Sequence, residues 1–126
     1  MSWQEYVDNN LVGTQQFSQG AIVGLQGGVW AASKGFDVSH AEILALANGF
    51  KNPDTVRTNS PLVDGKKYMV VKADERSIYG KLGKGGFCAV KTNQAIVIGV
   101  YGEGVQPGSA ASVVEKLADY LIANSY

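Results

Sequence analysis

The sequence has very few of the residues that build covalent cross-links, metal centres and catalytic triads. It contains one cysteine, Cys88, and one histidine, His40. A single cysteine excludes an internal disulfide, and one histidine with one cysteine cannot assemble a histidine-based triad or a His/Cys zinc site. We therefore expect no catalytic residues, no metal and no cofactor. Cys88 lies in an apolar stretch, so we interpret it as a buried strand residue.

Long hydrophobic runs are also missing. No stretch approaches the roughly 20 apolar residues of a membrane-spanning helix, and no signal peptide opens the chain. With 126 residues and 45% hydrophobic content, the chain can bury a core without cross-links. We expect one cytoplasmic domain over residues 1–126.

The chain as a whole has no excess charge, because 11 basic residues balance 11 acidic ones. This balance, without a recognised DNA- or RNA-binding motif, argues against a nucleic-acid partner. The basic residues nevertheless gather in one segment where Asp74 and Glu75 are the only acids: Lys66, Lys67, Lys72, Arg76, Lys81, Lys84 and Lys91. Two interpretations stay open, a surface for an acidic partner or solvated lysines that protect sheet edges.

Two capping boxes predict helices in the first half of the chain, at Ser2 with Glu5 and at Ser39 with Glu42. The first helix is expected to end at Gly13. The second is expected to run for about three turns and to stop near Gly49 and Pro53, with a polar loop over residues 52–60.

Short strands with turn signals between them fill most of the remaining sequence. The expected strands are residues 21–25 and 29–32, joined as a hairpin, and then 66–72, 77–81, 87–91 and 95–101. A last helix with a wide apolar stripe follows Pro107. The sequence therefore predicts an α+β fold, in which a central antiparallel meander has the N- and C-terminal helices on one face and the short helix on the other.

Aromatic residues are concentrated at the two ends of the chain and on one early strand. Trp3 and Tyr6 share one face of the first helix. Trp30 lies on the second strand, and Tyr120 and Tyr126 close the last helix. If these elements pack together, five rings form a trough that suits a proline-rich peptide, which offers ring faces for stacking and bare carbonyls for N–H and O–H donors. The alternative is that the rings are ordinary core.

Three segments resemble the motifs of the profilin family, in its short, non-vertebrate type. They are Met1-Ser2-Trp3-Gln4-Glu5-Tyr6-Val7-Asp8, Asp74-Glu75-Arg76-Ser77-Ile78-Tyr79-Gly80-Lys81 and Val114-Glu115-Lys116-Leu117-Ala118-Asp119-Tyr120-Leu121. The resemblance extends over essentially the whole chain. It implies a monomeric cytoplasmic and cytoskeletal protein that binds monomeric actin, promotes exchange of actin's nucleotide and binds proline-rich proteins such as formins. It also implies binding of phosphoinositide headgroups through basic surface.

The resemblance assigns residues to each of these surfaces. The polyproline-binding residues are Trp3, Tyr6, Trp30, Tyr120 and Tyr126. The actin-binding residues are Lys67, Met69, Val71, Lys72, Lys81, Lys91, Val105, Gln106, Gly108 and Lys116. The weaker phosphoinositide set is Lys66, Lys72, Arg76, Lys81, Lys84 and Lys91. Gln106 and Ser112 stand where vertebrate members carry histidine and lysine, so the strength of actin binding does not carry over.

Two other hypotheses remain beside this one. A polyproline-binding adaptor of the same fold would keep the aromatic trough without useful actin affinity. An enzyme that holds a nucleotide at the glycine-rich segment 102–108 is disfavoured, because the glycine spacing departs from that of dinucleotide-binding loops.

Overall fold

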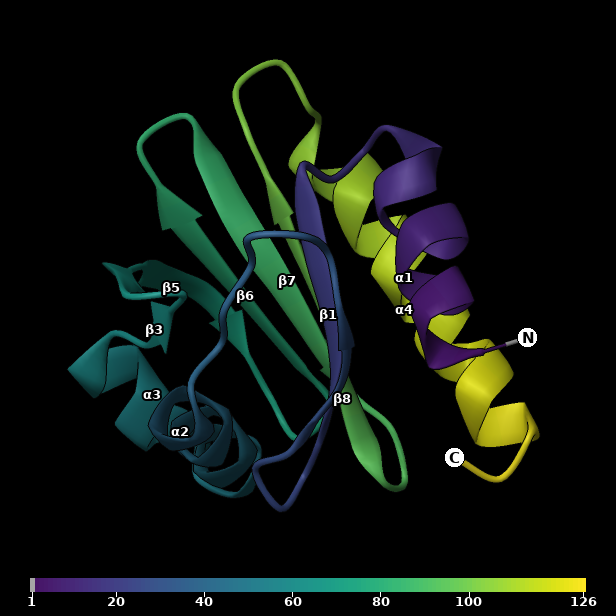
Figure 1. Cartoon of the computed structure of the whole chain (residues 1–126). Coiled ribbons are helices and arrows are strands. Elements are labelled where there is room, and N and C mark those ends of the chain that lie inside the picture. The colour runs from purple at the N-terminus through teal and green to yellow at the C-terminus, as the bar shows by residue number, and fades with distance from the viewer. Residues whose placement is uncertain (1) are drawn as a thin grey trace.

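The computed structural model describes residues 2–126, in which helices flank a sheet of short strands (Figure 1). The helices are α1 (Trp3–Asn10), the 3-10 helix η1 (Val12–Thr14), α2 (His40–Lys51), α3 (Pro53–Asn59) and α4 (Pro107–Ala123). The strands are β1 (Gln19–Gly24), β2 (Val29–Ala32), β3 (Leu62–Val63), β4 (Lys66–Lys67), β5 (Met69–Ala73), β6 (Ser77–Leu82), β7 (Gly85–Lys91) and β8 (Ala95–Tyr101).

The main sheet is antiparallel throughout and has six strands in the order β2-β1-β8-β7-β6-β5. Strands β5 to β8 form the expected meander. Strand β1 pairs with β8, with Ala21 opposite Ile98, and so adds the β1–β2 hairpin to the sheet. The turn of this hairpin uses Gly27 at φ +104°, a backbone conformation that side chains disfavour.

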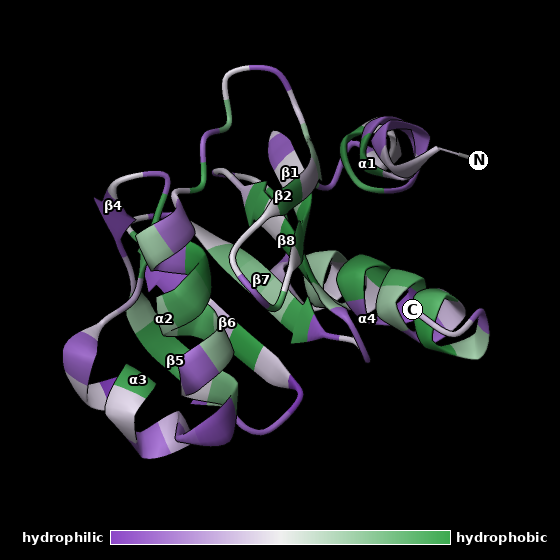
Figure 2. Cartoon of the chain, turned by 60° about the horizontal axis from the view of Figure 1, so that its bottom comes forward, coloured by the Kyte–Doolittle hydropathy of each residue, from purple (hydrophilic) through white to green (hydrophobic). Residues whose placement is uncertain are grey.

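Each face of the sheet carries its own hydrophobic cluster, because alternate side chains along a strand point to opposite faces. Ile96 and Ile98 of β8 pack in the cluster beneath α2 and α3. Ala95 and Val97 pack in the cluster beneath α1 and α4. In Figure 1, α1 and α4 lie side by side on one face, and the two ends of the chain come close together. Figure 2 shows α1 end-on, with its hydrophobic side turned toward the sheet. The predicted α+β arrangement is confirmed.

The two predicted capping boxes are present. The Ser2 hydroxyl accepts from the Glu5 N–H at 3.2 Å, and the Ser39 hydroxyl accepts from the Glu42 N–H at 3.2 Å. In both boxes the glutamate side chain accepts from the N–H of the serine. These local bonds satisfy N–H groups that the first turn leaves without a partner, which explains why both helix starts were readable from the sequence.

Two local predictions were wrong. Residues 52–60 are not a loop but contain α3. This helix begins at Pro53, because the fixed φ of proline fits a first helical position. It also buries Val56 against the core. The single strand expected over residues 66–72 is divided. Its first part, β4, pairs with β3 in a separate two-stranded sheet, and β5 begins only at Met69. Buried Tyr68 lies at the division and donates its N–H to Pro61 at 3.0 Å.

Several element ends also differ from the expected positions. Helix α1 ends at Asn10 rather than Gly13, and η1 occupies the residues between. Strand β1 begins at Gln19, and β7 begins at Gly85 rather than at residue 87. In each case the end depends on pairing or packing with distant residues, which local sequence signals do not record.

Candidate functional site

The five aromatic residues at the chain ends and on β2 form one continuous cluster. The Trp3 ring lies at its centre, with centroid distances of 4.8 Å to Trp30, 4.8 Å to Tyr126 and 5.7 Å to Tyr6. Tyr120 extends the cluster from Tyr6, at a centroid distance of 6.0 Å. None of these pairs is stacked face to face, because three are tilted by 47° to 53° and the Trp3–Tyr126 pair is edge-on at 82°.

The cluster lies at the boundary between the core and solvent. Trp3, Tyr6 and Trp30 are partly buried against the hydrophobic cluster beneath α1 and α4. Tyr120 and Tyr126 are 51% and 42% exposed. The rings are therefore neither ordinary core nor isolated surface residues. They form an aromatic surface that rests on the core, and packing from below limits the rotamers of the inner rings.

The last residues of the chain are fixed by a Schellman motif at the end of α4. The Tyr126 N–H donates to Leu121 at 2.8 Å and the Ser125 N–H donates to Ile122 at 3.0 Å, with Ser125 at φ +70°. The Tyr126 carbonyl then accepts from the Gln94 N–H and, at 2.8 Å, from the Thr92 hydroxyl. Thr92 and Gln94 thus hold Tyr126 beside Trp3. Sequence reasoning missed both residues, because no local signal marks a partner that lies more than 30 positions away.

The N-terminal half of the cluster is positioned by α1 and by a glycine on β1. The Gln4 side chain donates to the Ala32 carbonyl at 2.8 Å and so ties α1 to β2. A Cβ on Gly24 would lie 2.8 Å from the indole nitrogen of Trp30. The absence of a side chain at Gly24 therefore leaves room for the Trp30 ring.

The chemistry of the aromatic surface is that of a hydrogen-bond donor and a stacking partner. The neighbouring Tyr120 hydroxyl, ahead of burial, raises the pKa of Tyr6 above the ordinary value of a phenol. Protonated phenols and indole N–H groups donate, and the ring faces offer apolar contact. A segment that has exposed carbonyls and no N–H groups of its own matches this set.

A second candidate surface lies at the β5 edge of the sheet. Met69 and Val71 are 65% and 62% exposed, which is unusual for large apolar side chains. Met69 pairs with Lys81 across β5 and β6, and a bulge beside Val71 shifts the register before Lys72. The remaining predicted actin-binding residues are exposed Lys67 on β4, half-buried Val105 before α4, and exposed Gln106, Gly108 and Lys116 at and along α4.

Lys91 is the one predicted actin-binding residue that the strand register separates from this surface. Lys91 is opposite Ile96, which belongs to the cluster beneath α2 and α3. Tyr79, the partner of Lys72, belongs instead to the cluster beneath α1 and α4. By the alternation of a strand, Lys91 therefore lies on the opposite face of the sheet from Lys72.

Comparison with known proteins decides the family. The sequence model for profilin matches residues 1–126. Profilin-2 of Acanthamoeba castellanii is 55% identical over 126 residues, which cover 100% of both chains. The crystal structure of Acanthamoeba castellanii profilin II matches with a TM-score of 0.96 at 54% identity, over 99% of this chain and 100% of that one. The chain belongs to the profilin family.

A more distant member shows the same fold. Mouse profilin IIa, solved in complex with a double repeat from the FH1 domain of mDia1, matches with a TM-score of 0.84 at 24% identity, over 100% of both chains. None of the helices in residues 2–126 of the present chain is long and apolar enough to span a membrane.

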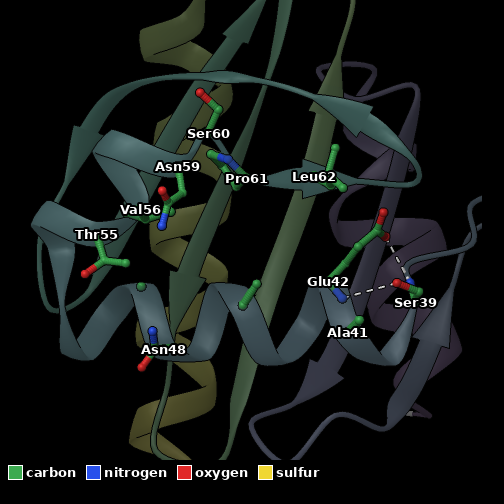
Figure 3. Close-up of a pocket in the computed structure, with 12 residues that line it drawn as sticks. Ser39, Ala41, Glu42, Asn48, Thr55, Val56, Asn59, Ser60, Pro61 and Leu62 are labelled. Atoms are coloured by element: carbon green, nitrogen blue, oxygen red, sulfur yellow. Dashed lines mark hydrogen bonds between the residues drawn. The ribbon is translucent and has the colours of Figure 1, made fainter.

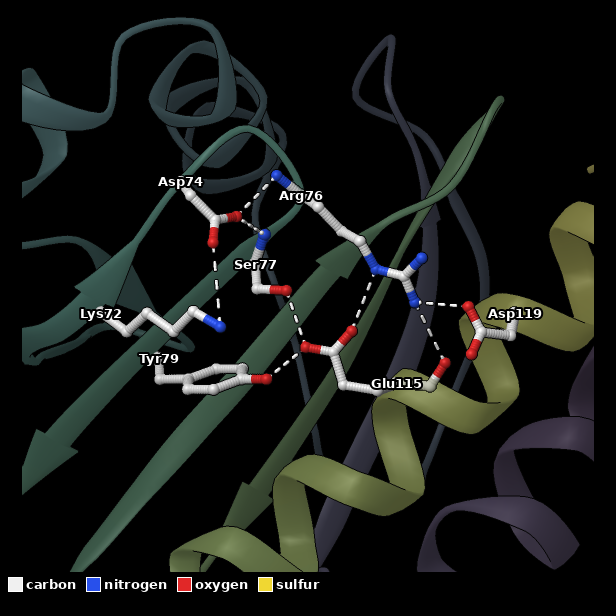
Figure 4. Close-up of polar contacts among 7 residues, drawn as sticks. All are labelled: Lys72, Asp74, Arg76, Ser77, Tyr79, Glu115 and Asp119. Atoms are coloured by element: carbon white, nitrogen blue, oxygen red, sulfur yellow. Dashed lines mark hydrogen bonds and ion pairs between the residues drawn. The ribbon is translucent and has the colours of Figure 1, made fainter.

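Three cations of the basic segment have acidic partners in this profilin fold, and two of the three pair with carboxylates from other parts of the chain. Arg76 contacts Glu115 at 3.0 Å and Asp119 at 2.7 Å, both on α4 (Figure 4). Lys72 lies 3.8 Å from Asp74 and also 5.1 Å from the centre of the Tyr79 ring. Lys84 contacts Glu103 at 3.1 Å. Half of the predicted phosphoinositide set therefore has an acidic partner, which weakens its attraction for an anionic headgroup.

Glu115 is the centre of the polar contacts between α4 and the sheet. Its carboxylate accepts from the Ser77 hydroxyl at 2.7 Å, from the Tyr79 hydroxyl and from the Arg76 guanidinium (Figure 4). Burial, reinforced by this carboxylate, raises the pKa of Tyr79. Burial, again reinforced by Glu115, raises the pKa of Cys88 to about 12. Cys88 is 2% exposed, so its predicted place inside the sheet is confirmed.

A separate cavity of about 360 Å³ lies between α2, α3 and the segment that leads into β3 (Figure 3). Its one ionisable lining residue is Glu42. The Glu42 carboxylate already accepts from the N–H groups of Ser39, Asp64 and Gly65, at 2.7 to 3.0 Å. Because these bonds occupy both oxygens, Glu42 serves the structure of two turns rather than acid–base chemistry. Within residues 2–126 no group of three His, Cys, Asp or Glu side chains could hold a metal ion.

Proposed function

We propose that this protein binds monomeric actin and proline-rich ligands at two separate surfaces, and regulates actin polymerisation by binding rather than by catalysis. The observation that carries the proposal is the aromatic cluster, in which five rings from both chain ends and β2 form one partly exposed surface. Its residues are Trp3, Tyr6, Trp30, Tyr120 and Tyr126. Membership of the profilin family supports the actin part of the proposal.

The proline-rich partner follows from the chemistry of the cluster. A polyproline II segment presents bare carbonyls and ring faces, which match indole N–H and phenol O–H donors on flat rings. The same fold in mouse profilin IIa has been solved with a double repeat from the FH1 domain of mDia1. We therefore propose proline-rich proteins such as formins as partners, in the cytoplasm and at the cytoskeleton.

The proposed actin surface comprises exposed residues of β4, β5 and β6 together with α4. Apolar Met69 and Val71 would exclude water at its centre, and lysines such as Lys81 and Lys116 would steer it toward an acidic partner. Nucleotide exchange would follow if binding favours an actin conformation with a more open nucleotide cleft. We leave Lys91 out of this surface, because it lies on the opposite face of the sheet.

We propose phosphoinositide binding only as a weak, salt-sensitive activity. Lys66 and Lys81 are exposed and Lys91 is half-buried, and none of the five ion pairs found in residues 2–126 includes any of these three lysines. Because Lys72, Arg76 and Lys84 have acidic partners, few cations remain for a headgroup.

A titration of tryptophan fluorescence with oligoproline tests the first surface. Trp3→Ala should lower the affinity by about 30-fold or more, because Trp3 contacts three other rings of the cluster. Circular dichroism would verify that the variant is folded. Equal loss of oligoproline and actin binding would contradict the two-surface proposal.

The release rate of a fluorescent ATP analogue from monomeric actin tests the second surface. The protein should accelerate release, and Lys116→Glu should remove the acceleration. Lys51→Glu is the matched control, because Lys51 is an exposed lysine on α2, across the sheet. If the wild-type protein has no effect and forms no complex with actin, the polyproline-binding adaptor becomes the better account.

A further inference from the structure

A groove runs between α1 and α4 from the aromatic cluster toward the start of α4. Its volume is about 560 Å³. Tyr6 and Tyr120 of the aromatic cluster line one part of it, and Lys116 lines another. The remaining lining residues are Asn9, Asn10, Thr14, Val113 and Leu117. The groove therefore joins the proposed proline-rich site to a lysine that sequence reasoning had assigned only to the actin surface.

Lys116 is the only charged residue that lines this groove. No carboxylate lies within 4.0 Å of its ammonium group in residues 2–126. Its acidic neighbours on α4, Glu115 and Asp119, both contact Arg76. On α1, Asp8 accepts from Gln4, whose side chain is turned toward β2. The nearby acids are thus held elsewhere, and an anionic group in the groove would meet a cation without a competing partner.

The spacing fits a continuous peptide. Lys116 precedes Tyr120 by four residues, which is about 6 Å along the helix axis. A polyproline II segment advances about 3.1 Å per residue. A residue about two to four positions beyond the prolines that contact Tyr6 and Tyr120 would therefore reach the Lys116 ammonium group, given the length of the lysine side chain.

We propose that the α1–α4 groove is a specificity subsite that selects an acidic residue close to one end of the proline run. The carboxylate of the ligand would pair with Lys116. The side-chain amides of Asn9 and Asn10 would form hydrogen bonds with the backbone of the bound peptide. This inference rests on the proposed polyproline function. It adds a charge preference that five aromatic rings cannot supply, because stacking does not distinguish glutamate from glutamine.

The test compares oligoproline peptides that carry two glutamates at one end with otherwise identical peptides that carry two glutamines. Both ends are tried, because the direction of the bound peptide is open. The wild-type protein should bind the better glutamate peptide about 1.4- to 5-fold more tightly than its glutamine counterpart, as for an exposed ion pair. This ratio should fall toward one at about 1 M salt.

Variants then assign the preference to Lys116. In Lys116→Gln the glutamate and glutamine peptides should bind equally. In Lys116→Glu the glutamine peptide should bind more tightly than the glutamate peptide, and a peptide that carries two lysines should bind more tightly than either. Lys51→Gln should keep the wild-type ratio, because Lys51 lies on α2, at the other face of the sheet. An inverted preference cannot result from misfolding, so the outcome remains informative if a variant is less stable.

Two negative outcomes have different meanings. If neither glutamine peptide binds the wild-type protein, the proposed polyproline function itself fails. If the glutamine peptides bind but glutamate adds nothing at either end, or the preference survives in Lys116→Gln, the aromatic site stands and the acidic subsite is refuted.

Discussion

Replacing Glu115 by alanine tests how α4, which carries both Lys116 and Tyr120, is held on the sheet. The Glu115 carboxylate accepts from the Ser77 hydroxyl at 2.7 Å and from the Tyr79 hydroxyl. Ser77 is 2% exposed and Tyr79 is half-buried, so water cannot fully replace the lost acceptor. Alanine at position 115 should therefore leave two polar groups of β6 poorly satisfied.

The magnitude follows from these contacts. Each hydroxyl left without its acceptor costs about 1–2 kcal/mol. The ion pair with Arg76 adds less than about 1 kcal/mol, because the Arg76 side chain is 41% exposed and keeps Asp119 at 2.7 Å. We expect Glu115→Ala to lower the free energy of unfolding by about 2–4 kcal/mol, which is a fall of about 8–16 °C in Tm for a domain of this size.

Thermal and urea unfolding followed by circular dichroism would measure this loss. Asp119→Ala is the matched control, since it removes the other partner of Arg76 at a position 65% exposed, and it should cost less than about 1 kcal/mol. A double-mutant cycle with Tyr79→Phe should give a coupling of about 1 kcal/mol between positions 115 and 79. Equal losses in Glu115→Ala and Asp119→Ala, or a coupling near zero, would refute the reasoning.

Three further predictions concern single groups. Burial and the Glu115 carboxylate raise the folded-state pKa of Tyr79, so its contribution to stability should be complete below about pH 10, the pKa of an unfolded tyrosine, and be lost above it. The urea midpoint should then fall less steeply above about pH 10 in Tyr79→Phe than in wild type, and parallel curves would contradict this. Burial raises the pKa of Cys88 to about 12, so a thiol reagent at about pH 8 should react with it only after unfolding. Rapid labelling of the native protein would show that the sheet opens locally. Gly24→Ala should displace the Trp30 indole, because a Cβ there would lie 2.8 Å from its nitrogen, and should weaken oligoproline binding by about 5-fold, roughly half the free energy of losing a whole ring contact. Gly28→Ala, whose Cβ would meet nothing within 4 Å, should bind oligoproline as the wild type does. Equal weakening by Gly24→Ala and Gly28→Ala would show that displacement of Trp30 does not cause the loss of affinity.

Some features of the candidate site follow from the local sequence, and others depend on residues that are distant along the chain. The positions of Trp3 and Tyr6 could be read from the sequence, because a capping box starts α1 and helical spacing places both rings on one side. The contact of Trp3 with Tyr126 depends on a Schellman motif at Ser125 and on hydrogen bonds from Thr92 and Gln94. Nothing in the sequence near Thr92 marks it as a support for the chain end.

The charge pattern shows the same limit more sharply. Counting along residues 66–91 gives an excess of basic residues, yet Glu115, Asp119 and Glu103 neutralise Arg76 and Lys84 from outside that segment. A count along the chain weights neighbours in sequence, whereas an ion pair depends on distance in space.

The sequence by itself determined the starts of α1, α2 and α4, the last three strands of the meander and the two apolar faces of the sheet, because capping, turn chemistry and side-chain periodicity act within a few residues. Residues 52–60 were wrongly predicted to be a loop, since Pro53 and its polar neighbours are equally typical of one, and the burial of Val56 against the core accounts for α3 instead. The tertiary structure alone decided that Lys91 lies across the sheet from Lys72, and that Lys116 shares a groove with Tyr6 and Tyr120. These relations arise from strand register and helix packing, which depend on the free energy of the whole fold rather than on any one segment.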